Sequence, residues 1–147
     1  MANVEAYYKN GAGATMLSSA ADVDALVDAV LAQPFENSVI ALYSNDRALT
    51  EQGYPDHELR IALYAEAKVG GIRYAGSDGT TRGVWFVPGA PSERDETFYY
   101  YQGHDEGWPQ DSEVSIDQLR QAVREFVEGN GTRPAGFEWT EWPQDIS

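Results

Sequence analysis

Two stretches of the chain place their apolar residues three or four positions apart, which is the pattern of an amphipathic α-helix. In the first stretch, the apolar stripe consists of Val23, Leu26, Val27, Val30 and Leu31. Ser19 and Asp22 are typical of a helix N-terminus, where a side-chain oxygen and a negative charge are favourable. Pro34 lacks a backbone N–H, so we expect the helix to end before it.

The second stretch has the clearer pattern, and its apolar stripe consists of Ile116, Leu119, Val123, Phe126 and Val127. Charged and amide side chains occupy the opposite face. Ser115 and Gln118 have the spacing of a capping box, in which each side chain bonds to the backbone N–H of the other residue. Gly129 lies where glycine commonly ends a helix. The sequence therefore predicts a helix between Ser115 and Gly129.

Around these helices, short runs rich in β-branched and aromatic residues predict strands. We expect strands at residues 4–9, 38–43, 59–65, 69–75, 82–87, 97–102 and 137–142, and a polar loop at 46–57. The connections between the central strands are a few residues long, which favours antiparallel hairpins over parallel crossovers. We therefore predict one domain spanning residues 1–147 with an α+β fold. It contains an antiparallel β-sheet of about six or seven strands, with two main helices packed on one face.

Aromatic residues are concentrated in the strand predicted at 97–102. Alternation along a strand places Tyr99 and Tyr101 on one face and Phe98 and Tyr100 on the other. We expect one of these pairs in the core. The other pair forms either an exposed platform or a wall packed beneath a helix.

The sequence around each tryptophan bears on whether its side chain lies in the core or on the surface. Core packing is the default for Trp85 and Trp139, which lie in predicted strands. Trp108 lies between glycine and proline in an acidic segment, so it fits a core position and a surface position equally well.

Charge adds a functional constraint, because the chain carries 24 acidic and 10 basic residues and a net charge of −14. Direct binding of nucleic acid is therefore not expected, since phosphate recognition requires a basic surface. An acidic protein attracts a basic partner over long distances, although acidity can also serve solubility alone. Between Glu93 and Asp117 there are eight acidic residues and a single arginine, so this window carries half of the net charge. This concentration favours a functional acidic patch.

The composition also limits the cellular context. Cysteine is absent, which excludes disulfides, thiolate nucleophiles and cysteine-ligated zinc. The N-terminal residues show no basic flank followed by an apolar stretch, so we expect no signal peptide. No run of about 18 apolar residues occurs, and we expect no membrane span. These features favour a soluble, cytoplasmic protein.

The sequence contains no pattern that predicts catalysis. Gly11 and Gly13 follow a strand as in a dinucleotide-binding loop, but Met16 stands at the third glycine position. His57 and His104 have acidic neighbours and could join in a metal site, yet neither has a second histidine at helical spacing, which favours solvated histidines. The serines lack the context of a nucleophile, and the carboxylates are too numerous to single out a pair. We expect no catalytic residue, cofactor or metal.

A series of short motifs in the second half of the chain resembles the Imm1 family, whose members protect bacteria against polymorphic toxins. The motifs are Tyr101-Gln102-Gly103-His104, residues 108–115, residues 122–126, Gly131-Thr132-Arg133-Pro134 and Glu138-Trp139, together with residues 69–74 and 83–85. Trp108 departs from the pattern, because phenylalanine is more usual before this proline. The resemblance implies an α+β fold without catalysis or cofactor. It also implies a cognate toxin domain as partner, often a nucleic-acid deaminase or nuclease.

The charge distribution and the resemblance together predict that an acidic, aromatic surface covers the active site of a basic toxin domain or an adjoining face. The candidate toxin-binding residues are Glu93, Asp95, Glu96, Tyr99, Tyr101, Asp105, Glu106, Trp108, Asp111 and Glu113. The alternative from another functional class is a small-molecule-binding module or weak enzyme with an aromatic pocket near His104.

Overall fold

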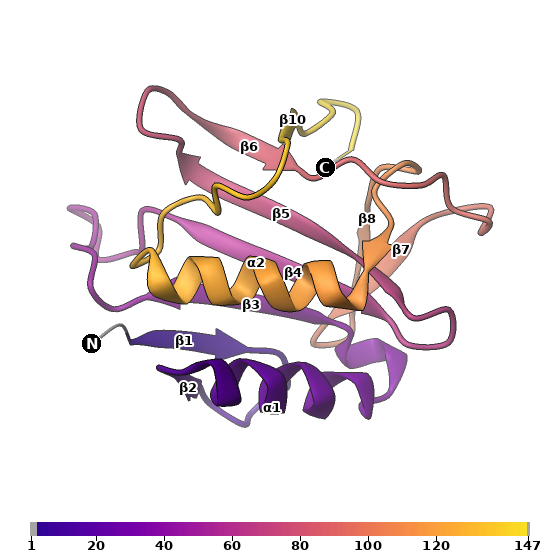
Figure 1. Ribbon diagram of the computed structural model, residues 1–147, viewed down its shortest axis with the longest axis horizontal. Helices are drawn as coiled ribbons and strands as arrows, with labels where there is room; N and C mark the ends of the chain where they lie inside the picture. The colour runs from indigo at the N-terminus through magenta and orange to yellow at the C-terminus, as the bar shows by residue number, and fades with distance from the viewer. Residues whose placement is uncertain (1–2, 147) are drawn as a thin grey trace.

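The computed structural model describes residues 3–146 and has an α+β fold. Its strands are β1 (Val4–Tyr7), β2 (Thr15–Leu17), β3 (Val39–Ser44), β4 (Glu58–Tyr64), β5 (Val69–Ser77), β6 (Arg82–Phe86), β7 (Phe98–Tyr101), β8 (His104–Gly107), β9 (Val114–Ser115) and β10 (Thr140–Glu141). The helices are α1 (Ala20–Leu31) and α2 (Ile116–Glu128), with a short 3-10 turn, η1 (Phe35–Asn37), between α1 and β3. Figure 1 shows both helices in front of the same face of the sheet, as the sequence predicts.

The main sheet is antiparallel and contains eight strands, in the order β10-β6-β5-β4-β3-β1-β2, with β9 paired to the end of β5. β7 and β8 form a separate two-stranded sheet. The N-terminal caps of both helices agree with the sequence prediction. The Ser19 hydroxyl accepts a hydrogen bond from the Asp22 N–H, and Ser115 and Gln118 form the complete capping box. No helix within residues 3–146 has the length and apolar character needed to cross a membrane.

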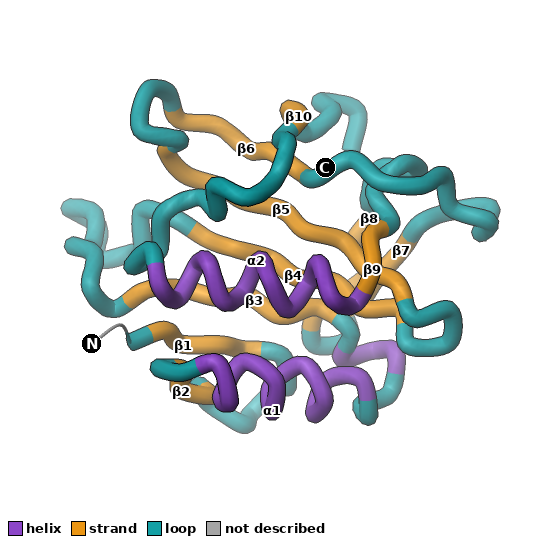
Figure 2. The backbone as a smooth tube through the Cα atoms, in the orientation of Figure 1, coloured by secondary structure: helices purple, strands orange, loops and turns teal. Residues whose placement is uncertain are grey.

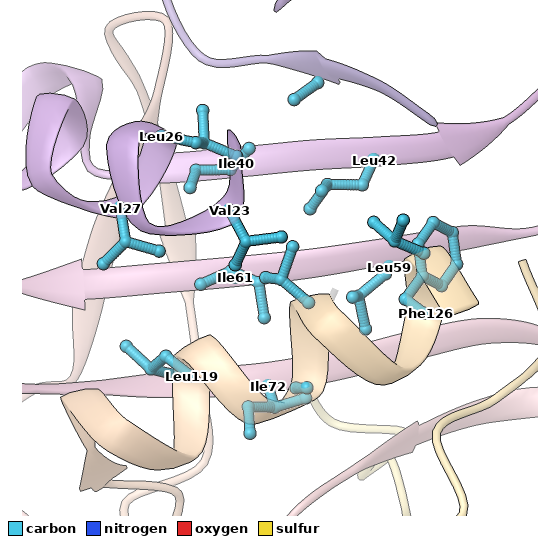
Figure 3. Packing of buried hydrophobic residues seen from close by; sticks show 14 of the residues in the cluster. Val23, Leu26, Val27, Ile40, Leu42, Leu59, Ile61, Ile72, Leu119 and Phe126 are labelled. Atoms are coloured by element: carbon cyan, nitrogen blue, oxygen red, sulfur yellow. The ribbon is translucent and has the colours of Figure 1, made fainter. Parts of the chain in front are cut away.

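The hydrophobic core lies between the sheet and the two helices. Figure 3 shows Val23, Leu26 and Val27 of α1 and Leu119 and Phe126 of α2 directed toward apolar residues of the sheet. Their labelled partners in the sheet are Ile40, Leu42, Leu59, Ile61 and Ile72, all of which are fully buried. The apolar stripes predicted for the two helices are thus the faces that form the core.

Two adjacent glycines in β5 allow close packing on both faces of the sheet. A Cβ atom at Gly70 would collide with the Ala62 carbonyl oxygen and lie 2.7 Å from a methyl group of Leu119 in α2. A Cβ atom at Gly71 would lie 2.6 Å from the Trp108 ring on the opposite face. The missing side chains therefore let α2 approach one face and Trp108 the other.

Two predicted strands differ in the structure. Residues 97–102 were expected in the central sheet, but β7 pairs only with β8. A tight turn at Gln102 and Gly103 pairs β7 with β8 instead, and the φ angles of 50° and 85° at these residues are typical of the two-residue turns that close hairpins. The strand expected at 137–142 is reduced to Thr140–Glu141, while Phe137 and Trp139 pack partly buried against the core. β2, β8 and β9 were not predicted.

Candidate functional site

The sheet face opposite the helices contains a groove of about 910 Å³. Its floor comes from alternate residues of β3 to β6, and one wall comes from Asp105 to Gly107 in β8. Figure 2 shows β7 and β8 set apart from the main sheet, beside the ends of β3 to β5. The sequence interpretation missed this groove. This groove extends from the β7–β8 hairpin to the open face of the sheet.

Charged residues on the groove floor are paired with one another. Arg60 and Arg73 lie directly opposite in neighbouring strands. Glu58 separates their like charges: its Oε1 lies 2.6 Å from Arg60 Nε and 3.5 Å from an Arg73 terminal nitrogen. Glu106 of β8 also forms an ion pair with Arg60. The hairpin is therefore tied to the sheet by a charged contact as well as by apolar packing.

Tyr43 completes the bonding of Glu58. Its hydroxyl donates a hydrogen bond of 2.5 Å to Glu58 Oε2. Burial, followed by the negative charge of Glu58, raises the pKa of Tyr43 well above its usual range. Tyr43 is therefore a neutral donor throughout physiological pH, and its hydroxyl stabilises the carboxylate that holds the two arginines.

His57 lies at the edge of this groove and is buried, with only 4% of its surface exposed. Its Nδ1 is 2.9 Å from Asp56, and its Nε2 accepts a hydrogen bond of 2.8 Å from the Ser44 N–H. These partners define a neutral ring with the proton on Nδ1. Arg47 links Asp56 to the carbonyl oxygen of Gly131. The expectation of a solvated histidine is wrong here, because both ring nitrogens have partners inside the fold.

Burial is the main cause that lowers the pKa of His57, and the Asp56 hydrogen bond only partly opposes it. The unfolded chain binds a proton at this ring more readily than the folded chain. The contribution of neutral His57 to the free energy of unfolding should therefore be fully present above pH 6.5. It should decrease as the pH drops from 6.5 toward the pKa of His57 in the folded state. The loss amounts to about 1.4 kcal/mol for each tenfold difference in proton affinity.

Urea unfolding at pH 7.5, 6.5 and 5.5 checks this prediction. The variant His57→Gln keeps a hydrogen-bond acceptor but cannot titrate, so its stability should decrease less with acidification than that of the wild type. The matched control is His104→Gln, because His104 is exposed. Parallel pH curves for the wild type and His57→Gln would contradict the assignment.

Five of the candidate toxin-binding residues are exposed carboxylates, and we refer to them as the acidic surface: Glu93, Asp95, Glu96, Asp105 and Asp111. Within residues 3–146, none of the five forms an ion pair. Four belong to the loops that precede β7 and follow β8, and Asp105 lies in β8 itself.

The two loops of the acidic surface are held together by backbone hydrogen bonds. The Gly89 N–H donates to the Asp111 carbonyl at 2.7 Å, and the Ser92 N–H donates to the Gln110 carbonyl at 2.7 Å. Arg94 anchors the first loop, because its guanidinium lies 4.1 Å from the Tyr64 ring centre and donates to the Phe98 carbonyl. The exposed carboxylates therefore project mainly from two loops whose backbones are hydrogen-bonded to each other.

The other candidate residues are placed differently. Tyr99 is completely buried and Trp108 is 4% exposed, so both belong to a second apolar cluster beneath the hairpin and not to an exposed surface. Tyr99 of β7 and Trp108, which follows β8, pack inward against Val39 and Ala62, so neither side chain is exposed to a partner in this structure.

Three further candidates are largely engaged within the protein. The Glu113 side chain is 11% exposed, lies 3.6 Å from Arg94 and accepts a hydrogen bond from Ser92. Glu106 is paired with Arg60, and the guanidinium of Arg60 also lies 4.8 Å from the half-buried ring of Tyr101. Their main partners are therefore intramolecular.

The structure brings Asp105 and Glu106 together with residues that the sequence interpretation did not select. Glu58, Arg60 and Arg73 line the groove with them. The available signal was the alternation of polar and apolar positions in the strand predicted at 59–65, because Arg60 between Leu59 and Ile61 marks a sheet face without full apolar cover.

His104 does not line this groove or the two smaller cavities of about 500 and 380 Å³. The aromatic residues along the main groove are Tyr43, Tyr54 and Trp142. In the part of the chain that the structure describes, no three or more His, Asp or Glu side chains are grouped in a way that could hold a metal ion.

Comparison with protein-family models gives a match. The family model described as "Immunity protein Imm1" matches residues 11–141, which is nearly the whole chain. No curated protein matches the sequence.

Proposed function

We propose a function from one premise: this chain belongs to the Imm1 immunity protein family. The protein binds a cognate toxin domain of a polymorphic toxin system and neutralises it without a catalytic step of its own. It acts in the cytoplasm of the producing cell, where a toxin directed at nucleic acid would meet its substrate. The toxin domain is a nucleic-acid deaminase or nuclease with a basic surface.

The observation that carries this proposal is the acidic surface. Its five exposed carboxylates lack ion-pair partners among residues 3–146, and the loops that bear them are fixed by hydrogen bonds. Enzymes that act on nucleic acid require a basic substrate channel. A fixed array of carboxylates is complementary to such a channel, attracts it over long distances and loses little conformational freedom on binding.

The acidic surface neutralises the toxin by occupying this channel or a face beside it. Substrate phosphates are then excluded by charge and by volume. Some nuclease–immunity protein pairs reach the upper range of non-covalent affinity, with Kd values of about 10⁻¹³ M or below. The open sheet groove adjoins the acidic surface at Asp105 and is available for further contacts.

Co-expression tests the proposal. We expect this protein to restore growth to cells that express the C-terminal toxin domain encoded by the neighbouring gene. We also expect the two purified proteins to co-elute as a complex. A toxin that still kills in the presence of abundant, folded protein would contradict the proposed function.

The second candidate function is a small-molecule-binding module or weak enzyme. The groove volume of about 910 Å³ lies within the range of ligand pockets, which favours this alternative. Two observations count against it. Seven of the lining residues are charged, whereas ligand pockets are lined mainly by apolar and aromatic side chains. His104 is also not among the residues that line the groove. Rescue from the toxin together with the absence of bound metabolite after purification would favour the immunity function.

A further inference from the structure

Short apolar side chains line part of the groove. Ala75 of β5 and Val84 of β6 are direct cross-strand partners on the open face. Trp142 follows β10 and forms the neighbouring wall, with its backbone N–H bonded to the Val84 carbonyl. The helices cover only the other face (Figure 1), so a partner can approach this face directly.

The two arginines on the groove floor have very different partners. Arg60 is bonded to Glu58 through two of its nitrogens and to Glu106 through a third. Arg73 has a single distant contact, 3.5 Å from Glu58, and its Nε has no hydrogen-bond partner. The Arg73 guanidinium lies over the Trp142 ring, with 4.8 Å between its Cζ and the ring centre.

Arg73 is therefore a half-buried positive charge with little compensation. Burial lowers its pKa, and Glu58 only partly opposes this effect, which is consistent with the geometry. A half-buried guanidinium with free donors is stabilised by a carboxylate that can accept two parallel hydrogen bonds. The aromatic ring of Trp142 attracts the guanidinium and restricts its position in the groove, which favours such a pair.

We propose that this groove docks a carboxylate-bearing segment of the cognate toxin domain, and that Arg73 is the principal partner of that carboxylate. This inference rests on the proposed function and adds to it the face that docks and the chemistry of the docked segment. The acidic surface provides long-range attraction to the basic part of the toxin. The groove provides a short-range contact of the opposite polarity, which fixes the orientation of the complex.

The two contributions act over different distances, which makes them separable. Attraction by the net charge of −14 extends over about 8 Å at physiological ionic strength, and beyond that distance salt screens it. The contact at Arg73 operates only at hydrogen-bond distance inside the groove. A negative charge introduced in the groove should therefore weaken binding, whereas the overall electrostatic attraction predicts that it strengthens binding.

Three substitutions at Val84 test this inference. Val84→Gln partly fills the groove without charge, Val84→Glu places a carboxylate near Arg73, and Val84→Lys places a second cation there. We expect Val84→Glu to weaken binding to the purified, inactivated toxin domain at least about tenfold more than Val84→Gln, which is about 1.4 kcal/mol. Val84→Lys should bind as well as Val84→Gln or more tightly. Attraction by the overall charge alone predicts the reverse order.

The matched control is the same series at Met16, which is exposed on β2 opposite Glu5 and outside the groove. The Met16 variants should follow the overall field, with lysine weaker than glutamate. Unfolding midpoints measured for every variant without toxin separate loss of binding from loss of folding.

Each outcome has a defined meaning. If the three Val84 variants bind equally, or if lysine is the weakest, the groove does not receive a carboxylate and this inference is wrong, while the proposed function stands. If the wild-type protein does not bind the toxin domain, the proposed function itself fails. If a Val84 variant does not fold, Arg73→Gln and Arg73→Lys repeat the test, and glutamine should weaken binding more than lysine, which keeps the charge but not the two parallel hydrogen bonds.

Discussion

Simultaneous reversal of three carboxylates of the acidic surface, Glu93→Lys, Asp95→Lys and Glu96→Lys, is expected to slow association with the toxin domain by at least about tenfold. Each reversal adds two positive charges, so the net charge changes from −14 to −8. Electrostatic attraction raises association rates by about 10 to 10³ where opposite surfaces meet. These three side chains form no ion pair among residues 3–146, so folding should be almost unaffected. Glu106 remains unchanged because it holds Arg60.

A second triple variant provides the control. Glu51→Lys, Glu128→Lys and Glu138→Lys change the net charge by the same amount at exposed positions outside the acidic surface. Stopped-flow association measured at 50 and 500 mM salt should show a larger decrease for the first variant, and the difference should shrink at high salt. Equal rates for the two variants would show that only total charge matters and would remove the acidic surface from the mechanism.

Truncation of Trp108 to alanine is expected to destabilise the protein by about 3 to 5 kcal/mol. The Trp108 ring contacts Tyr99 at 5.5 Å and Trp142 at 5.2 Å between ring centres, in both cases edge to face. It also fills the space left above Gly71. Its removal creates a cavity where the hairpin meets the sheet, so the β7–β8 hairpin should become mobile and Asp105 should lose its fixed position.

Urea unfolding measures this loss, and Trp108→Phe is the control. Phenylalanine keeps an aromatic ring at this site, so this variant should lose less stability than the alanine variant and should retain toxin binding. A loss of less than about 1 kcal/mol in Trp108→Ala would mean that the ring does not hold the hairpin, because surface substitutions typically have effects of that size or smaller.

The helices could be predicted because their signals are local. The stripe around Phe126 and the capping box at Ser115 use residues within one or two turns of each other, and the structure contains both. The strand at 97–102 was assigned to the wrong sheet because pairing depends on residues outside the strand. The turn at Gln102 and Gly103 lacks the usual asparagine or aspartate signal of such hairpins.

The candidate site could be predicted only in part. Negative charge is visible in the composition, and the exposure of four of the five carboxylates of the acidic surface follows from their position in loops. The sequence does not show which acidic residues are neutralised by ion pairs. Glu106, for example, pairs with Arg60, which lies 46 positions away in the chain. The groove was also hidden, since it depends on the register that places Arg60 opposite Arg73 and on the small residue Ala75.

The separate pairing of β7 and β8 has a consequence for how the protein can diverge. The hairpin is attached through the packing of Tyr99 and Trp108, through the ion pair between Glu106 and Arg60, and through the backbone hydrogen bonds from Ser38 to Tyr100 and from Gly103 to Glu36. His104 and Asp105 take no part in the register of the eight-stranded sheet. Mutation can therefore alter the exposed tip while the inherited framework keeps its stability. A lineage can in this way acquire a new binding preference without having to evolve a new fold.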